Sequence, residues 1–413
     1  MRASEGGANR GAAIVIVATG IAGVAGYGIQ AVAGFGLDAA QYAGFSVFWA
    51  ALFLIVGAVG GVQQEIARAV QVSADADRGG ARTLLRFAAL AAVVVAALVL
   101  ASSPLWARLV FPTDTAAVVA LLCVGGAASV CVAVAVGTLY GAHAWRWVGA
   151  AIIVDPVLRL MLVSAALAAR RPDLIEVAIV APILLTLVLV AIFMLRMIRR
   201  GVVVDVPMPR LIANAGRTLA AAAATAVMIS AFPLFIGAFA RDTPPDEVGA
   251  LLFNLTVTRA PLVIPALALQ SLLIVRLRHL SVGLGRRLAA LLGAVFAVTA
   301  AFSVVAGVWI APLIGAWLGE DYAIGGVTLA ALVASAGLTA ALCITGAAVV
   351  ARGGHTAFVV GWIVAAACSI LLLAVPGDLD QRVVLALTLG PVGGLAIHIG
   401  ALIRRESARG RPA

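Results

Sequence analysis

The chain has 413 residues, of which 64% are hydrophobic and only 11% are charged, and its basic side chains are 28 arginines without a lysine. This composition excludes an ordinary soluble domain, in which about 25% of residues are charged. The formal net charge of +10 indicates loops held against an anionic membrane leaflet and does not indicate a nucleic-acid partner.

Twelve apolar stretches follow one another along the chain. Each is close to the ~20 residues that a helix needs to cross a bilayer. The sequence therefore predicts an all-α, polytopic membrane protein with about 12 transmembrane helices. The predicted spans, in chain order, are Gly11–Gly34, Tyr42–Val62, Phe87–Leu105, Ala116–Tyr140, Val148–Ala169, Val177–Leu195, Leu219–Ala240, Val248–Gln270, Ala289–Leu313, Ile324–Val350, Thr356–Val375 and Val383–Ile403.

The arginines indicate which way round the chain sits in the membrane. If the N-terminus is cytoplasmic, 21 arginines fall in cytoplasmic segments, 5 in external loops and 2, Arg159 and Arg259, inside spans. Cytoplasmic loops of membrane proteins carry an excess of basic residues. We therefore expect a multi-pass protein of the cell membrane with both termini in the cytoplasm, and the arginine-only, alanine-rich composition favours a bacterial source.

The two halves of the chain resemble one another. A central cytoplasmic segment, Arg196–Arg217, separates six spans from six, and the pattern of a long helix, an acidic external loop and a helix ending in glutamine then begins again. Six spans per half restore the same orientation, which predicts a parallel repeat of two six-helix bundles, residues 1–200 and 201–413. In transporters built this way the substrate site lies near mid-membrane, where the repeats meet.

Glu65 and Arg68 stand at the cytoplasmic end of the second span, three residues apart. That spacing favours an interfacial ion pair over a gate, although both readings stay open. In the first span, Tyr27 and Gln30 are polar positions in a glycine-rich helix, and they suit either the lining of a cavity or hydrogen bonds between helices. His398, in the last span, favours a packing role over a proton relay.

Asp155 and Arg159 lie inside the fifth span, four residues apart and therefore on one helix face. One interpretation is a self-neutralising structural pair. The other is a polar patch on a central cavity, where Pro156 weakens the helix. The residue types alone do not decide between them.

Arg259 lies in the middle of the eighth span, and Pro261 is expected to break the helix two residues later. Charged side chains inside a bilayer are costly and commonly functional. The structural alternative is an ion pair with another helix or bonds to freed carbonyls. We favour a guanidinium that lines a water-filled cavity and binds a phosphate or pyrophosphate through two hydrogen bonds.

The histidines and cysteines show no metal-ligand spacing, and no nucleotide-binding glycine loop is present, so we expect neither a metal nor a cofactor. Four short motifs nonetheless resemble those of a known family. They are Gly-Tyr-Gly-Ile-Gln at 26–30, Tyr-Ala-Gly-Phe-Ser-Val-Phe-Trp at 42–49, Gln-Glu-Ile-Ala-Arg at 64–68, and the stretch from Asn254 to Leu262 that contains Arg259-Ala-Pro.

These motifs resemble polysaccharide-biosynthesis flippases of the multidrug/oligosaccharidyl-lipid/polysaccharide exporter superfamily, over essentially the whole chain. The resemblance implies two bundles around a central cavity, alternating access, and movement of polyprenyl-diphosphate-linked glycans. The resemblance carries over specifically to Arg259 for substrate binding and, more weakly, to Glu65 and Arg68 as a gate. The further candidates for substrate binding are Asn254, in the same motif as Arg259, and the polar span residues Asp155, Arg159, Tyr27 and Gln30. The implied partners are the lipid-linked glycan, the bilayer and other membrane proteins of polysaccharide assembly.

Three other readings compete with glycan transport. A purely structural or scaffold protein is one, but it would not need a repeat with broken, charged helices. A cation-coupled multidrug antiporter of the same superfamily needs a carboxylate in its cavity, and only Asp155 qualifies. A membrane glycosyltransferase or glycan polymerase would be an enzyme and needs acidic residues in external loops. The external acids here stand in very short loops, which favours a transporter over an enzyme.

Overall fold

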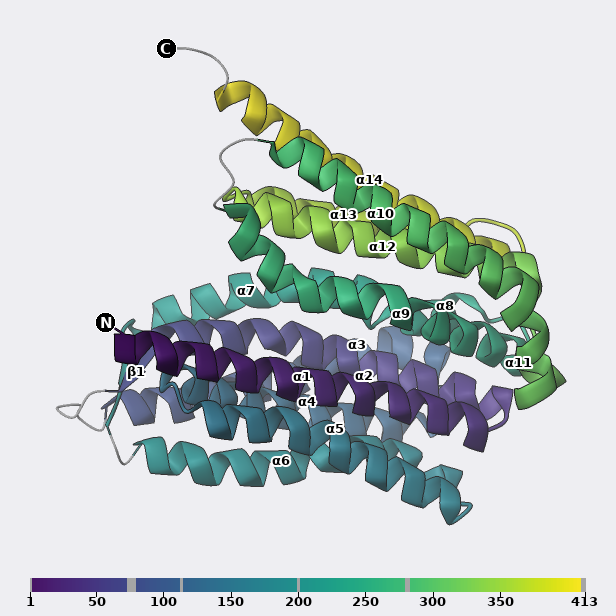
Figure 1. Ribbon diagram of the computed structural model, residues 1–413. Helices are drawn as coiled ribbons and strands as arrows, with labels where there is room; N and C mark the ends of the chain where they lie inside the picture. Colours follow the sequence, from purple (N-terminus) through teal and green to yellow (C-terminus); the bar gives the residue numbers. More distant parts are fainter. Residues whose placement is uncertain (1, 73–78, 112–113, 199–200, 279–282, 410–413) are drawn as a thin grey trace. The chain divides into compact units, whose positions relative to one another are not determined.

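The computed structural model describes residues 2–72, 79–111, 114–198, 201–278 and 283–409 (Figure 1). Within these residues, twelve helices are long and apolar enough to cross a membrane. The prediction of an all-α membrane protein with about twelve spans is confirmed. Residues 199 and 200, where the two predicted halves join, lie outside the described residues.

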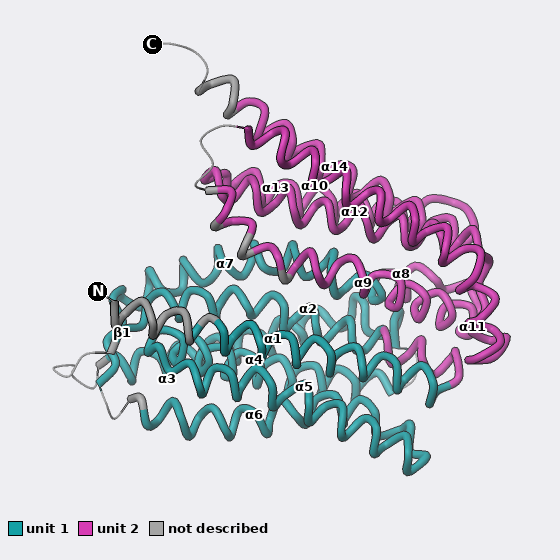
Figure 2. Tube along the Cα trace, viewed as in Figure 1, with its two compact units in different colours: residues 1–37, 47–234 teal, residues 38–46, 235–413 magenta. Residues whose placement is uncertain are grey.

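The helices form two compact units (Figure 2). Unit 1 comprises residues 1–37 and 47–234, and unit 2 comprises residues 38–46 and 235–413. The helix α2 (Ala39–Ala69) therefore gives its first two turns to unit 2 and the rest of its length to unit 1. The boundary at residue 200 and the repeat symmetry of the halves stay predictions.

Unit 1 is built around helices that pack along their length, α1 on α5, α3 on α4, and α6 on both α4 and α5. Small residues allow this close approach. A Cβ atom at Gly149 of α5, for example, would lie 2.7 Å from Ile14 of α1. Besides most of α2, the elements of unit 1 are α1 (Arg2–Gly36), α3 (Gly79–Val110), α4 (Thr115–Gly141), α5 (Trp145–Ala168), η1 (Pro172–Leu174), α6 (Ile175–Ile198) and α7 (Met208–Ile229).

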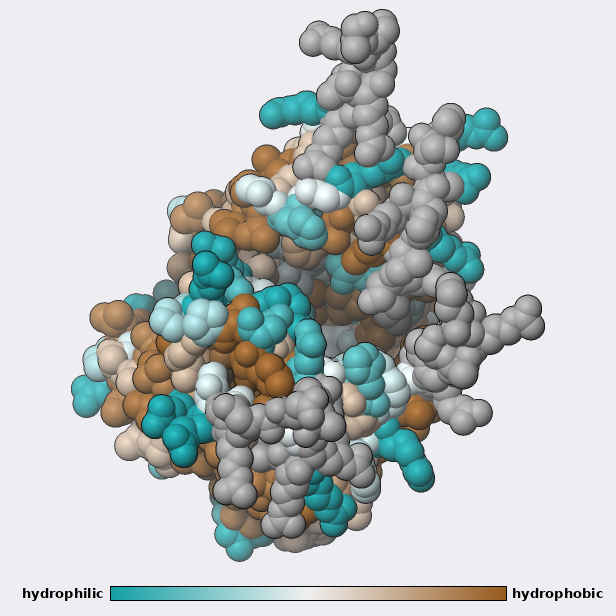
Figure 3. All heavy atoms as spheres, turned by 90° about the vertical axis from the view of Figure 1, so that its left-hand side faces the viewer, coloured by the Kyte–Doolittle hydropathy of each residue, from teal (hydrophilic) through white to brown (hydrophobic). Residues whose placement is uncertain are grey.

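A two-stranded antiparallel ribbon, which the sequence analysis did not anticipate, joins two loops of unit 1. Strand β1 (Val70–Val72) follows α2, strand β2 (Val202–Val204) follows α6, and Val70 pairs with Val204. The run of valines suits a short ribbon, because β-branched residues favour extended backbone. Hydrophilic side chains gather at the end of the molecule that carries β1 (Figure 3), as the positive-inside pattern leads us to expect of the cytoplasmic end.

Unit 2 is organised around α12, which packs against α9, α10 and α14. Its core contains fully buried side chains such as Trp362 and Leu342. After residues 38–46, the chain returns to this unit through α8, which begins in unit 1. The elements are α8 (Phe232–Phe239), α9 (Pro245–Arg278), α10 (Leu284–Val305), the π-helical turn η2 (Ala306–Ile310), α11 (Ala311–Leu318), η3 (Glu320–Tyr322), α12 (Gly326–Ala351), α13 (His355–Leu372) and α14 (Leu379–Arg409).

The seventh span differs from its prediction. The sequence predicts Leu219–Ala240, whereas α7 begins at Met208 and ends at Ile229, and α8 begins at Phe232. Pro209 explains the early start, because proline suits the first turn of a helix. Pro233 explains the stop, because it has no N–H with which to continue the hydrogen-bond ladder of α7.

The expectation that Pro261 breaks its helix is wrong. Helix α9 runs without interruption from Pro245 to Arg278, with both Pro261 and Pro265 inside it. Each proline removes a single ladder bond, that of the carbonyl four residues earlier. Transmembrane helices tolerate this loss because neighbouring helices support the backbone, and α12 lies against α9.

Candidate functional site

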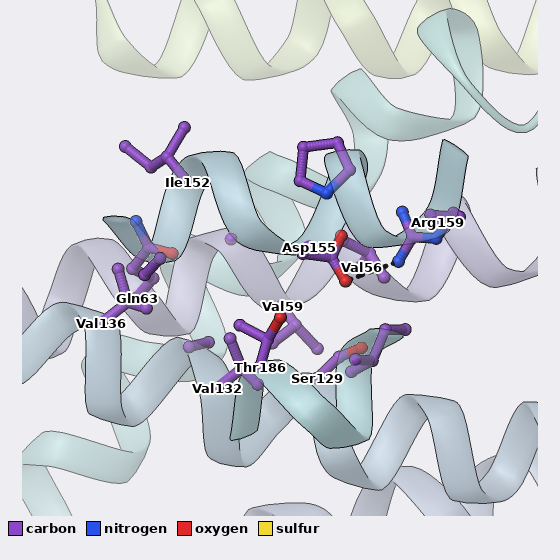
Figure 4. A pocket seen from close by; sticks show the side chains of 15 residues that line it. Val56, Val59, Gln63, Ser129, Val132, Val136, Ile152, Asp155, Arg159 and Thr186 are labelled. Atoms are coloured by element: carbon purple, nitrogen blue, oxygen red, sulfur yellow. Dashed lines mark hydrogen bonds and ion pairs between the residues drawn. The ribbon is translucent and has the colours of Figure 1, made fainter. Parts of the chain in front are cut away.

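Four helices of unit 1 line an open cavity of about 270 Å³ (Figure 4). We call it the unit-1 cavity. Its walls are mostly valine, alanine and isoleucine side chains, but each helix adds polar groups. These are Gln63 from α2, Ser129 from α4, Asp155 and Arg159 from α5, and Thr186 from α6. The cavity therefore offers convergent polar groups inside an apolar wall, as small-molecule sites do.

Asp155 and Arg159 form an ion pair along α5, as their spacing predicts. Nη2 of Arg159 donates to Oδ1 of Asp155 at 2.8 Å, and Nε donates to the carbonyl of Ile179 in α6 at 2.9 Å. The two side chains differ in access, because Asp155 is 25% exposed and Arg159 only 3%. The carboxylate is therefore the partner that a ligand in the cavity would meet.

Two aromatic rings of α2 cover the guanidinium of Arg159. Its Cζ lies 5.1 Å from the ring centroid of Phe53 and 5.7 Å from that of Trp49, and these two rings stack at 4.2 Å. A guanidinium over an aromatic face gains a cation–π attraction. The guanidinium of Arg159 therefore has its partners within unit 1, namely a carboxylate, a carbonyl and two aromatic rings. These contacts explain how a charged group is accommodated inside a membrane span.

Prolines inside α5 and α6 change the backbone beside this pair. Pro156 and Pro182 lack an N–H, so the carbonyls of Ile152 and Ala178 lose their donors within the helix. Ile152 lines the cavity, and Ala178 precedes the residue whose carbonyl accepts from Arg159. Both helices nevertheless run through their prolines, so Pro156 loosens α5 locally without ending it.

Thr186 is a cavity residue that the sequence does not predict. It is 1% exposed, and its hydroxyl has no hydrogen-bond partner. Ser129, which the sequence also does not predict, donates to the carbonyl of Gly125 at 2.7 Å. Figure 4 shows both side chains directed into the space that Asp155 faces. A lone threonine in an apolar span gives no sequence signal of such a site, because the partners come from other helices.

Glu65 and Arg68 lie at the end of α2, next to the β1–β2 ribbon, in what we call the α2-end cluster. Oε1 of Glu65 accepts from Arg68 at 2.6 Å and from Asn214 of α7 at 2.9 Å, and Arg68 lies 3.8 Å from Asp205. The expected ion pair is present, and the bond to Asn214 ties α7 to α2. Whether the cluster also acts as a gate stays a prediction.

We expect Glu65→Ala to lower the free energy of unfolding by about 1.5–3 kcal/mol, the range for hydrogen bonds to a charged group. The reason is that Glu65 is only 4% exposed and holds two partners. Thermal unfolding of the detergent-purified protein measures the change. The exposed neighbour Gln64→Ala is the matched control, and equal stability of the two variants would contradict a tethering role.

Arg259 and Asn254 lie on α9 in unit 2, and neither is among the residues that line the unit-1 cavity. Arg259 is 7% exposed and interacts with other groups of the protein, so it does not stand on an open outer surface. Asn254 is fully buried, and its amide donates to the carbonyls of Ala250 and Tyr322. Asn254 therefore connects α9 to η3. In η3, burial raises the pKa of the Tyr322 hydroxyl above its ordinary value.

Tyr27 and Gln30 lie on α1 and do not line the unit-1 cavity. Gln30 is buried, Tyr27 is half-buried, and both interact with other groups. Their position favours the reading as contacts between helices. His398 is also buried, with Nδ1 3.1 Å from the Thr345 hydroxyl and Nε2 3.3 Å from the Phe358 carbonyl, which agrees with a packing role.

A second, larger cavity of about 910 Å³ lies among the loops of unit 2, next to the first turns of α9, α12 and α14 and the loop that follows α13. Its polar rim includes Asp242, Glu247, Asp380 and Arg382. Arg382 donates to the carbonyls of Phe239 and Leu373, so it caps the ends of α8 and α13. Within the described part of the chain, no three histidine, cysteine, aspartate or glutamate side chains form a metal-binding group.

Comparison with known proteins finds relatives of the chain by sequence and solved structures with a similar fold. No family model matches the chain. It is 35% identical to the "Uncharacterized protein Rv1510" of Mycobacterium tuberculosis over 375 residues, covering 89% of this chain and 85% of that protein. It is 31% identical to the "Uncharacterized protein Rv3630" of the same organism over 416 residues, covering 98% and 95%.

Two solved structures share the architecture. An inward-facing multidrug resistance MATE family transporter of the MOP superfamily has a TM-score of 0.69 at 14% identity, with 96% of both chains covered. The lipid II flippase MurJ, in an inward closed conformation, has a TM-score of 0.69 at 12% identity over 94% of this chain and 87% of that one. The chain belongs to the family of Rv1510 and Rv3630, and it has the fold of two six-helix halves found in the MATE transporter and in MurJ.

Proposed function

We propose that the protein is a membrane transporter that moves a polyprenyl-diphosphate-linked glycan, or a related polysaccharide precursor, across the cytoplasmic membrane by alternating access. The main support for a transport function is the fold, since the similarity to the MATE transporter and to MurJ extends over both halves of the chain. Folds host several functions, so the substrate must be argued from the residues.

Arg259 supports a diphosphate substrate. It is a buried arginine in a helix whose acidic residues, Asp246 and Glu247, stand in the first turn. A guanidinium recognises phosphate oxygens through two parallel hydrogen bonds. In our proposal Arg259 meets the diphosphate on the path of the substrate, with Asn254 holding α9 in place.

A cation-coupled multidrug antiporter is the second candidate, because the unit-1 cavity contains the accessible carboxylate of Asp155. Its ion pair with Arg159 speaks against it, since a coupling cation would have to displace or oppose a guanidinium 2.8 Å away. A glycosyltransferase is less well supported, because the two solved structures are a transporter and a flippase. If the protein transports a lipid-linked glycan, other membrane proteins of polysaccharide assembly would make that substrate and use it after transport.

Reconstitution tests the proposal directly. Liposomes containing the full chain and a fluorescent polyprenyl-diphosphate oligosaccharide are exposed to a quencher that does not cross the bilayer. We expect the label of the inner leaflet to reach the quencher faster than in protein-free liposomes. A rate equal to that of protein-free liposomes would reject glycan transport, and cation-driven movement of ethidium without movement of the lipid would select the antiporter.

A depletion strain gives the same test in cells. We expect lipid-linked glycan to accumulate on the cytoplasmic leaflet when the protein is withdrawn, because synthesis continues while translocation stops. Unchanged glycan lipid on both leaflets would contradict the proposal.

A further inference from the structure

We propose that the unit-1 cavity binds a neutral, hydroxyl-rich group, namely one sugar residue of the transported glycan. The proposal rests on the glycan-lipid function given above and says where a part of that substrate is recognised. In this proposal different residues recognise two parts of the substrate. Arg259 of unit 2 binds the diphosphate, and the unit-1 cavity binds a sugar ring.

The charge of the cavity is the first argument. Asp155 and Arg159 neutralise one another at 2.8 Å, so the cavity has no net charge to attract an ion. A cation near Asp155 would be repelled by Arg159, and an anion would first meet the carboxylate, because Asp155 is the more exposed of the pair. A neutral ligand that donates hydrogen bonds to the carboxylate avoids both penalties.

The unpartnered hydroxyl of Thr186 is the second argument. It is almost completely buried, and no protein group in the described part of the chain bonds to it. Buried polar atoms normally have partners, so this one indicates a partner that enters the cavity. A sugar hydroxyl both donates and accepts, and it can therefore satisfy Thr186 and the carboxylate of Asp155 together.

Shape and wall chemistry agree with a sugar. The cavity of about 270 Å³ has the volume of about nine liquid waters at ~30 Å³ each, which suits a single sugar ring. Apolar side chains such as Val56, Val132 and Ile183 form the walls. A pyranose has apolar C–H faces and a rim of hydroxyls, so it matches apolar walls to which four helices add polar groups.

Thr186→Val tests the proposal with little risk to the fold. The substitution keeps the shape and removes a hydroxyl that has no protein partner, so we expect unchanged or higher thermal stability. Ser129→Ala is the second cavity variant. Thr138→Val is the matched control, because Thr138 is buried in α4, bonds only to the carbonyl of Val134, and lies outside the cavity.

The measurement is the thermal unfolding of the detergent-purified full chain, titrated with N-acetylglucosamine and glucose, and separately with sodium chloride and potassium pyrophosphate. We expect at least one sugar to raise the unfolding temperature saturably in wild type and in Thr138→Val. In Thr186→Val the apparent Kd should rise about fivefold, the effect of one neutral hydrogen bond. General stabilisation by sugars through exclusion from the surface affects all variants alike and cancels.

Other results overturn the proposal. Stabilisation by sodium or pyrophosphate that depends on Thr186 or Ser129 would make the cavity an ion site. Equal sugar binding by all variants, or no saturable binding, would leave the cavity filled by water alone. If the wild type binds sugar through Thr186 yet moves no glycan lipid, the site stands and the proposed function fails. If wild type moves glycan lipid while the cavity variants bind sugar normally, the site fails and the function stands.

Discussion

Arg259→Ala is expected to slow translocation of the glycan lipid by about 10- to 100-fold, which corresponds to the loss of a hydrogen bond to a charged group. The guanidinium is buried in a membrane span, and it is the group to which we assign the diphosphate. Arg259→Lys keeps the charge but cannot make the two parallel bonds, so we expect an intermediate rate. The liposome quenching assay measures all three proteins.

A control on the same helix separates binding from general damage. Arg276 also lies on α9 but is exposed, and Arg276→Ala should translocate at the wild-type rate. Both alanine variants must insert and unfold at similar temperatures for the comparison to hold. If a stably folded Arg259→Ala protein translocated normally, Arg259 would have a packing role and the diphosphate would be bound elsewhere.

The features of this structure that depend on residues close together in the chain can be predicted from the sequence. Apolar length predicts the spans, and spacings of three and four residues predict the ion pairs Glu65–Arg68 and Asp155–Arg159, which the structure shows. These inferences succeed because both partners stand on one helix, where separation along the chain fixes separation in space.

The sequence does not reveal the partners that come from other helices. Asn214 bonds to Glu65 across 149 residues of chain, and the carbonyl of Ile179 accepts from Arg159 across a helix boundary. In the sequence, Thr186 is one threonine in an apolar span, and only the structure shows that it lines the same cavity as Asp155. The effect of Pro261 also depends on neighbours, because a helix that packs against another, as α9 does against α12, survives the loss of a ladder bond.

The Asp155–Arg159 pair yields the largest expected change in stability. Arg159→Met keeps most of the apolar stem but leaves the carboxylate of Asp155 without its cation. Breaking a buried ion pair by removing one partner costs about 3–5 kcal/mol, because a charge then remains without compensation. The exposed pair of Arg171 and Asp173, which are 57% exposed each, is the comparison, and Arg171→Met should cost far less stability because solvent already screens both charges.

A double variant then separates structure from function at this pair. Asp155→Asn together with Arg159→Met removes both charges, so most of the lost unfolding temperature should return. If the pair serves only the fold, glycan-lipid transport should return with stability. We expect instead that transport stays reduced, because asparagine offers the cavity a weaker acceptor than the carboxylate. Full recovery of transport would assign the pair to structure alone, and an Arg159→Met protein as stable as Arg171→Met would show that the carboxylate is solvated from the cavity and needs no cation.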